Sequence, residues 1–230
     1  MKFAGIQKLT LLDYPEHMAC TLFLRGCNLR CPFCHNASLL GGDGSRDEIT
    51  EDEILDLLEK RKNLLDGVAV TGGEPTLYPE LPEFIRKVKQ KGFSVKLDTN
   101  GTNPDMLFSL ISEKLVDYVA MDIKSAPDEY ERLTRTKPDM DSIERSKSLL
   151  LRGLVPYEFR TTLVKGLHTE ASVIGAARWI TGADAYYLQK YKDSGEILSP
   201  AGLSAFSDAE MKRFAQLAGQ YVSNTQCRGI

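Results

Sequence analysis

Three cysteines stand close together between Gly26 and Asn36, with the spacing C-x3-C-x2-C. They are Cys27, Cys31 and Cys34, and no fourth cysteine lies near them in the sequence. A structural zinc ion is usually closed by four ligands, and a fully protected iron–sulfur cluster also takes four thiolates. Three thiolates on one short loop can instead hold three corners of a cubane. The fourth iron is then open to a reactant, as the open position of a catalytic zinc ion is.

Four polar segments each follow an apolar run that is typical of a buried β-strand. They are Gly72-Gly73-Glu74-Pro75, Asp98-Thr99-Asn100-Gly101, Asp122-Ile123-Lys124 and Gln189-Lys190-Tyr191. Ligands of parallel α/β folds bind at the carboxyl ends of the strands, so we expect these segments and the cysteine loop on one rim. Their agreement in place is stronger evidence for a functional site than any one segment.

Strand and helix patterns alternate six times along the 230 residues, which favours a parallel sheet with crossover helices. The expected strands cover residues 18–24, 67–71, 93–98, 116–123, 155–161 and 184–189. Capping boxes at Thr50 and Ser207 predict two helix starts. An eight-unit barrel needs about 250 residues. We therefore expect an α/β fold, a partial, open (β/α)6 TIM-like barrel with an N-terminal strand extension (1–17) and a C-terminal helix, in one domain of residues 1–230.

The composition excludes several classes of protein. A net charge of −3 and a pI near 5.7 argue against a nucleic-acid binder, which usually has a high pI. No apolar run approaches the roughly 18 residues of a membrane span, and the N-terminus lacks the apolar core of a signal peptide. Five cysteines, three of them clustered, do not resemble a disulfide framework. A cytoplasmic protein without a membrane or nucleic-acid partner is expected.

The polar residues at the expected rim have physical uses there. Gly72 and Gly73 lack Cβ atoms, so their backbone could approach a ligand closely or simply make a tight turn. Asp98 and Asp122 would bring two like charges near one point, where they repel unless a cation or a lysine stands between them. Lys124 could also form an ordinary ion pair with Asp122.

Two other kinds of residue give weaker signals. Arg160 ends an expected strand, and its guanidinium can pair with the carboxylate of a ligand or partner, or form a surface salt bridge. His17 and His168 are expected in loops rather than as ligands.

The cysteine spacing and its flanks resemble the radical S-adenosylmethionine (SAM) superfamily, whose motif has an aromatic residue directly before the last cysteine. Phe33 fills that position, and His35-Asn36 looks like the activase branch of the superfamily. The resemblance implies a partial barrel and a [4Fe-4S] cluster with the three cysteines as its protein ligands. In the superfamily the amino and carboxylate groups of SAM chelate the open iron.

The same resemblance implies roles for the rim residues. The G-G-E element of the superfamily hydrogen-bonds the SAM amino group. The D-T-N-G and D-x-K segments look like those with which glycyl-radical activases bind a monovalent cation and the SAM carboxylate. A cation is thus expected at Asp98, Thr99 and Asp122. The candidate cofactor-binding residues are Phe33, Gly72, Gly73, Glu74, Asp98, Thr99, Asn100, Asp122, Lys124, Arg160 and Gln189.

Along its whole length the chain resembles the activating proteins of anaerobic ribonucleoside-triphosphate reductase. Gln189 departs from some formate-lyase activases, which have a SAM-contacting histidine there. The resemblance implies a flavodoxin- or ferredoxin-type reductant, reductive cleavage of SAM to methionine and a 5′-deoxyadenosyl radical, and hydrogen abstraction from a glycine of the partner reductase. The chain has no cysteine-rich insert, which implies one cluster.

Three alternatives stay open at this point. The first is a radical SAM enzyme that acts on a small molecule, such as a deazapurine-forming synthase of similar length. The second is an iron–sulfur electron carrier, which would need a fourth cysteine ligand and would have no use for Gly72, Gly73 and Glu74. The third and weakest is a zinc-binding interaction module.

Overall fold

The computed structural model describes residues 1–41, 48–193 and 195–230. Its main feature is an eight-stranded sheet with the order β10-β9-β8-β7-β6-β5-β3-β2. Every pairing from β3 to β10 is parallel, whereas the edge strand β2 runs antiparallel to β3. The strands are β2 (Gly5–Thr10), β3 (Ala19–Leu24), β5 (Gly67–Gly72), β6 (Ser94–Thr99), β7 (Tyr118–Asp122), β8 (Tyr157–Leu163), β9 (Tyr186–Lys190) and β10 (Thr225–Arg228).

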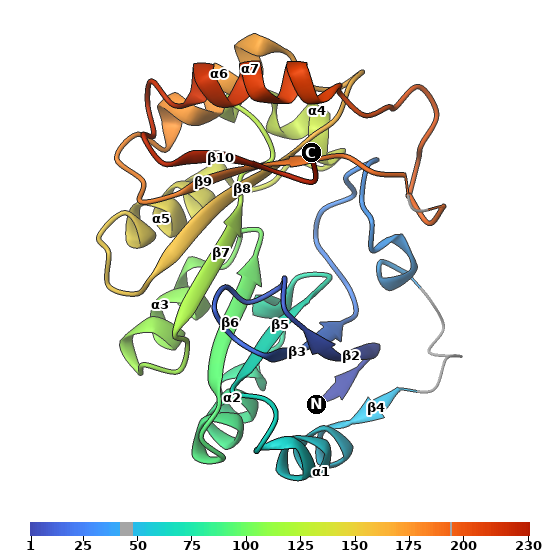
Figure 1. Ribbon diagram of the computed structural model, residues 1–230, viewed down its shortest axis with the longest axis vertical. Helices are drawn as coiled ribbons and strands as arrows, with labels where there is room; N and C mark the ends of the chain where they lie inside the picture. The colour runs from blue at the N-terminus through green and yellow to red at the C-terminus, as the bar shows by residue number, and fades with distance from the viewer. Residues whose placement is uncertain (42–47, 194) are drawn as a thin grey trace.

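Helices cover one side of this curved sheet, and its other side carries the cysteine loop (Figure 1). The sheet does not close, because its two edges are β2 and β10. The helices are α1 (Glu51–Arg61), α2 (Leu81–Gln90), α3 (Pro104–Ser112), α4 (Tyr130–Thr134), α5 (Met140–Leu150), α6 (Glu170–Trp179) and α7 (Asp208–Ala218). The expected open, partial barrel of alternating strands and helices is therefore confirmed. Within the described ranges, no helix is long and apolar enough to cross a membrane.

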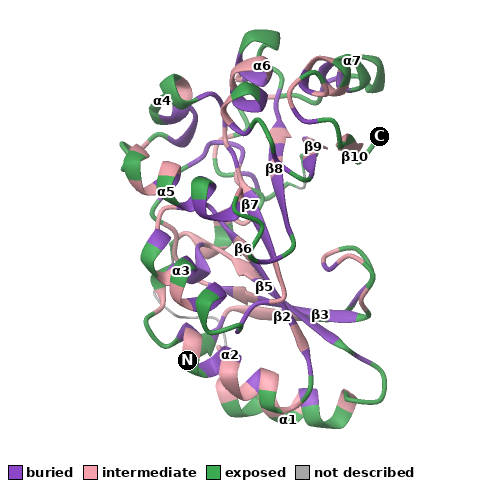
Figure 2. Ribbon diagram, turned by 90° about the vertical axis from the view of Figure 1, so that its left-hand side faces the viewer, coloured by how far each residue is buried: buried purple, intermediate pink, exposed green. Residues whose placement is uncertain are grey.

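The core lies between the sheet and its helices, where Figure 2 shows the buried residues along the strands and the inward sides of the helices. In α2 the buried residues are Leu81, Phe84, Ile85 and Val88, a spacing that puts one apolar stripe against the sheet. Both expected capping boxes form: the Thr50 and Ser207 side chains accept hydrogen bonds from backbone N–H groups three residues on.

The C-terminal end differs from the expectation. The helix α7 is present, but the chain continues into the strand β10, which pairs with β9 and forms one edge of the sheet. Residues 225–228 (Thr-Gln-Cys-Arg) lack the apolar alternation that marks a strand. Their place is fixed by tertiary contacts: Arg228 pairs with both oxygens of the buried Glu158 in β8, at 2.7 and 2.8 Å, and stacks over the ring of Tyr187.

Candidate functional site

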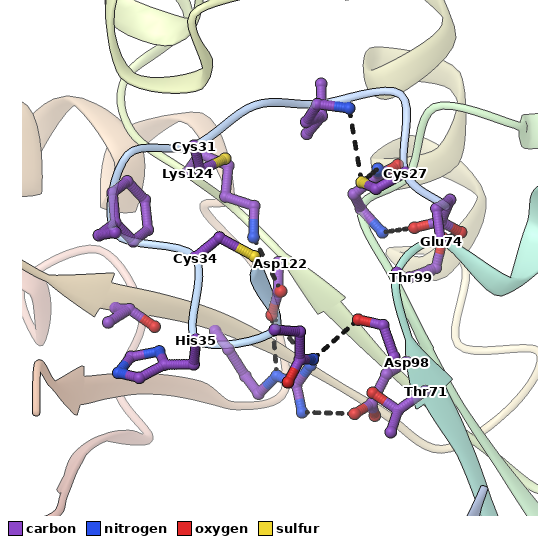
Figure 3. Close-up of a pocket in the computed structure, with 18 of the residues that line it drawn as sticks. Cys27, Cys31, Cys34, His35, Thr71, Glu74, Asp98, Thr99, Asp122 and Lys124 are labelled. Atoms are coloured by element: carbon purple, nitrogen blue, oxygen red, sulfur yellow. Dashed lines mark hydrogen bonds and ion pairs between the residues drawn. The ribbon is translucent and has the colours of Figure 1, made fainter. Parts of the chain in front are cut away.

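One pocket opens at the carboxyl ends of the parallel strands, next to the cysteine loop (Figure 3). The predicted convergence of the polar segments is confirmed, because every candidate residue from the sequence lines this pocket. The cysteine loop follows β3, and the other groups come from the ends of β5, β6, β7, β8 and β9. Sequence reasoning missed the lining residues Leu40, Thr71 and Thr162, which belong to no motif, and Leu29, an unspecified position of the cysteine motif.

The cysteine loop is held by segments from distant parts of the chain. The Arg30 N–H donates to the Thr134 carbonyl at 2.9 Å, and the Ser199 N–H donates to the Pro32 carbonyl at the same distance. The His35 ring lies 2.7 Å from the Lys192 carbonyl. A small apolar cluster fills the space behind the loop: Leu29, Cys31, Phe33, Leu133, Val164, Tyr191 and Ile197. The loop is therefore preorganised by backbone hydrogen bonds and by packing of Phe33.

The three thiols of the loop lie in buried or half-buried surroundings at the pocket. Burial raises the pKa of the Cys31 thiol to about 11 and raises that of Cys27, so binding a metal there must release protons. The Cys27 sulfur accepts from the Leu29 N–H at 3.4 Å and from the Asn100 amide at 3.7 Å. Among the described residues no three His, Cys, Asp or Glu side chains converge on one ion. A cubane needs no such convergence, since each thiolate binds a different iron.

Gly72 and Gly73 allow a close approach between two segments of the protein backbone. A Cβ on Gly73 would overlap the carbonyl of Gly26, and a Cβ on Gly72 would overlap the backbone of Leu24. Gly72 also has φ of +116°, a region that other residues rarely adopt. The Glu74 N–H donates to the Gly26 carbonyl at 2.8 Å. The missing side chains thus let the end of β5 pack against the start of the cysteine loop.

The Glu74 carboxylate connects two neighbouring strand ends. It is fully buried and accepts hydrogen bonds from the Thr76 N–H at 3.1 Å, the Thr99 hydroxyl at 2.7 Å and the Asn100 N–H at 2.6 Å. Burial raises the pKa of Glu74, and these donors act against that rise. The Asn100 amide in turn donates to Asn28 of the cysteine loop at 2.9 Å. Glu74 therefore holds the end of β6 against the loop.

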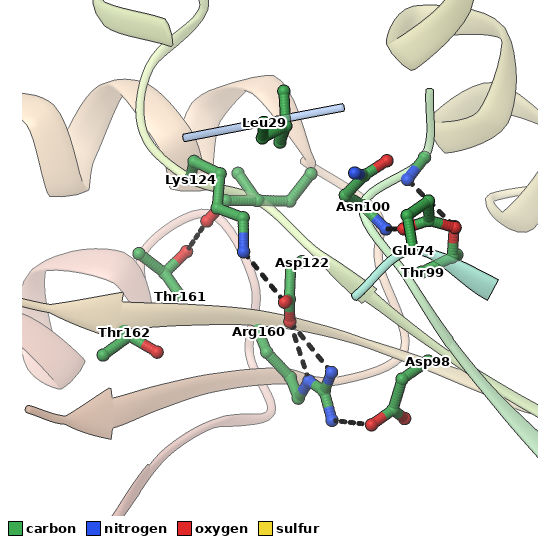
Figure 4. A network of polar contacts seen from close by, with 12 residues as sticks. Leu29, Glu74, Asp98, Thr99, Asn100, Asp122, Lys124, Arg160, Thr161 and Thr162 are labelled. Atoms are coloured by element: carbon green, nitrogen blue, oxygen red, sulfur yellow. Dashed lines mark hydrogen bonds and ion pairs between the residues drawn. The ribbon is translucent and has the colours of Figure 1, made fainter. Parts of the chain in front are cut away.

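Asp98 and Asp122 lie close together, as predicted, and the group between them is Arg160 (Figure 4). The Arg160 guanidinium is 3.2 Å from Asp98 and 2.9 Å from Asp122. Its side chain is only 12% exposed, so the alternative of a surface salt bridge is wrong. Lys124 pairs with Asp122 at 2.9 Å, and Lys96 pairs with Asp98.

These ion pairs set the charge state of the two carboxyls. Burial alone would raise the pKa of Asp98, but Arg160 and Lys96 outweigh it and hold that pKa below its usual range. Burial alone would also raise the pKa of Asp122, but Arg160 and Lys124 outweigh it and hold that pKa well below its usual range. Both carboxyls are therefore ionised at neutral pH. Lys96 was missed by sequence reasoning; its only signal is a place two residues before Asp98 in one strand.

His168 stabilises the backbone that follows β7 next to the pocket, a role that its sequence position did not indicate. It lies in a loop, as expected, but is buried. Its Nδ1 accepts from the Val164 N–H at 3.1 Å, and its Nε2 lies 2.9 Å from the Lys124 carbonyl. Because Nδ1 is an acceptor, Nε2 carries the proton and donates it to that carbonyl. His168 thus fixes the backbone at the end of β7.

The chain is similar to known proteins. The model of the radical SAM superfamily matches residues 21–179. A protein of Methanocaldococcus jannaschii is 31% identical over 99% of this chain and 95% of its own length. Its printed name is "Putative glycyl-radical enzyme activating enzyme". The pyruvate formate-lyase-activating enzyme of Clostridium pasteurianum is 33% identical over 54% of this chain and 53% of its own.

A solved structure has the same fold. It is Streptococcus suis SuiB bound to the precursor peptide SuiA, with a TM-score of 0.71 and 15% identity. The likeness covers 91% of this chain and 48% of that one, so this chain spans about half of the SuiB structure.

Proposed function

The chain belongs to the radical SAM superfamily, and we propose that it is the activase of a glycyl-radical enzyme, namely anaerobic ribonucleoside-triphosphate reductase. The observation that carries this proposal is one pocket that joins three thiols of one loop to polar groups of the following strand ends. The full-length similarity to a protein named as a glycyl-radical activating enzyme supports the glycyl-radical part. The choice of reductase rests on the sequence resemblance described above.

The cofactors of the superfamily are a [4Fe-4S] cluster and SAM, and the residues of the pocket fit both. We assign Cys27, Cys31 and Cys34 as the cluster ligands, because three soft thiolates on a preorganised loop leave one iron open. When bound, the cluster and SAM together supply the one-electron chemistry that removes a hydrogen atom from the Cα of a glycine. The protein binds and orients these groups.

Lys124, Arg160 and Lys96 provide more positive charge than Asp98 and Asp122 cancel. The SAM carboxylate is the anion that this surplus would attract, and Lys124 lies beside Cys31 of the cysteine loop (Figure 3). We assign the SAM amino group to the Gly72-Gly73-Glu74 segment. Gln189 and Phe33 line the same pocket and complete the proposed binding site.

The open sheet suits a macromolecular substrate. Because β2 and β10 do not pair, a glycine-bearing loop of a partner protein could reach the pocket from the open side. A flavodoxin- or ferredoxin-type protein is the proposed electron donor. The reductase and the reductant would then be the two protein partners of this chain.

The test combines the reconstituted protein, SAM, a reductant and the reductase under anaerobic conditions. Electron paramagnetic resonance should show the doublet of a glycyl radical on the reductase. A reductase whose radical-site glycine is replaced by alanine is the matched control and should give no doublet. Release of 5′-deoxyadenosine without a doublet on the intact reductase would reject this partner and favour a small-molecule substrate.

A further inference from the structure

Each carboxylate oxygen of Asp98 and Asp122 faces a cationic side chain, and Figure 4 shows the contacts with Arg160 and Lys124. Oδ1 of Asp98 pairs with Lys96, and Oδ2 lies 3.2 Å from the Arg160 guanidinium. Oδ1 of Asp122 lies 2.9 Å from Arg160, and Oδ2 lies 2.9 Å from Lys124. Each oxygen thus already has a cationic partner from the protein.

The network also carries more positive than negative charge before any ion is added. Two carboxylates face three cations, Lys96, Arg160 and Lys124, so the group carries a surplus of one positive charge. A bound metal cation would raise that surplus to two in a half-buried place, where like charges still repel. A bound carboxylate would instead neutralise it.

The third expected ligand of a cation is also occupied. The Thr99 hydroxyl donates to Glu74 at 2.7 Å and accepts from the Gly101 N–H at 3.1 Å. Metal cations of this kind favour carboxylate oxygens, and each carboxylate oxygen of Asp98 and Asp122 already faces a cationic side chain. Asp98, Thr99 and Asp122 therefore do not fit the monovalent cation that the sequence resemblance suggested.

We propose that the Arg160 guanidinium is a built-in replacement for that cation, so that SAM binding by this protein needs neither K⁺ nor Na⁺. Arg160 acts as a positioning residue: it joins β6 to β7 through Asp98 and Asp122 and thereby holds Lys124 toward the pocket. An arginine fork suits this task because it binds two carboxylates in a fixed geometry. The inference rests on the proposed function in one respect, that SAM binds in this pocket.

The test measures SAM affinity of the reconstituted protein by anaerobic calorimetry, in potassium chloride and in tetramethylammonium chloride of equal ionic strength. Tetramethylammonium is too bulky to replace a buried metal cation. The wild-type dissociation constants should agree within about twofold. Arg160→Ala should bind SAM about tenfold more weakly in tetramethylammonium and recover most of that loss in potassium. Arg160→Lys keeps the charge and should stay independent of potassium.

The possible results are read as follows. A wild-type protein that binds SAM about tenfold more weakly without potassium overturns the inference. The inference is also overturned if an Arg160→Ala variant with a full iron content binds SAM equally well with and without potassium. If that variant fails to load its cluster, the potassium dependence of SAM binding by the wild type and Arg160→Lys decides whether the inference holds. Absence of SAM binding in both salts would reject the proposed function itself, whereas potassium-dependent binding rejects only the inference.

Discussion

At the scale of single residues, the three thiols of the pocket have different surroundings. Cys31 packs among apolar side chains, whereas the Cys27 sulfur receives two N–H donors, from Leu29 and Asn100. Hydrogen bonds to sulfur and exclusion of water are the means by which a protein tunes an iron–sulfur cluster. The pocket supplies both, which is consistent with a redox role for the loop.

Replacing Cys27, Cys31 or Cys34 by alanine should abolish stable cluster formation, because a site with two thiolates cannot hold a cubane against water. Iron content and visible absorbance after anaerobic reconstitution measure the effect. Cys227→Ala is the matched control, since Cys227 lies in β10 and outside the pocket lining. A full iron content in any of the three variants would argue against that cysteine as a ligand.

His168 predicts a pH dependence of stability. Burial lowers the pKa of His168 below its usual value near 6.5, so the folded protein keeps the ring neutral while the unfolded chain takes up a proton. Stability is therefore lost as pH falls below about 6.5, by up to about 1.4 kcal/mol per pH unit.

His168→Gln should remove the part of the stability loss at low pH that comes from protonation of His168. Urea unfolding at pH 7.5 and pH 5.5 measures it, and the fall between the two values should be smaller in the variant. Equal falls in both proteins would mean that His168 does not titrate in the way its buried position requires.

At the scale of elements, the contact between the end of β5 and the start of the cysteine loop decides where the thiols lie. Gly73 and Gly26 touch backbone to backbone, and the Glu74 N–H bonds the Gly26 carbonyl at 2.8 Å. Asn36, at the far end of the loop, donates from its side chain to the Gly72 carbonyl at 2.8 Å. Both ends of the loop are thus tied to one strand end.

Gly73→Ala should therefore displace the loop. We expect a destabilisation of about 1–3 kcal/mol, the usual cost of overpacking, and a reduced iron content after reconstitution. Gly5→Ala in β2 is the control, because nothing lies within 4 Å of a Cβ at Gly5. If Gly73→Ala loads iron like the wild type with unchanged stability, the close contact does not position the cysteines.

Most elements could be predicted because each leaves a local mark. Apolar runs bounded by glycine and turn residues indicated the parallel strands, and the boxes at Thr50 and Ser207 marked helix starts. The strand β10 could not be found, because its pairing with β9 and the ion pair of Arg228 are tertiary contacts that leave no local pattern.

The site was predictable in its place and less so in its contacts. The polar segments follow strands, so their convergence on one rim follows from topology. The pairing of Asp98 and Asp122 through Arg160 depends on side-chain reach across three strands, which spacing along one strand cannot give. The missing Cβ atoms of Gly72 and Gly73 were recognised as allowing a close approach, but the sequence could not show that the backbone of Leu24 and Gly26 is what approaches them.

At the scale of the whole molecule, helices cover one side of the sheet (Figure 1). Charged residues at the strand ends line the pocket. Here β2 and β10 leave the sheet open, and we propose that this opening admits the glycine loop of the reductase. Fold, pocket and family thus support one account, reductive cleavage of SAM beside three cysteines.

The most direct test of that account is the release of 5′-deoxyadenosine. The reconstituted protein, given SAM and a low-potential reductant without any partner, should form 5′-deoxyadenosine and methionine in equal amounts. Cys31→Ala under the same conditions should form neither above the level of reductant alone. The account would be contradicted by a wild-type protein that carries a complete cluster, binds SAM and still releases no 5′-deoxyadenosine.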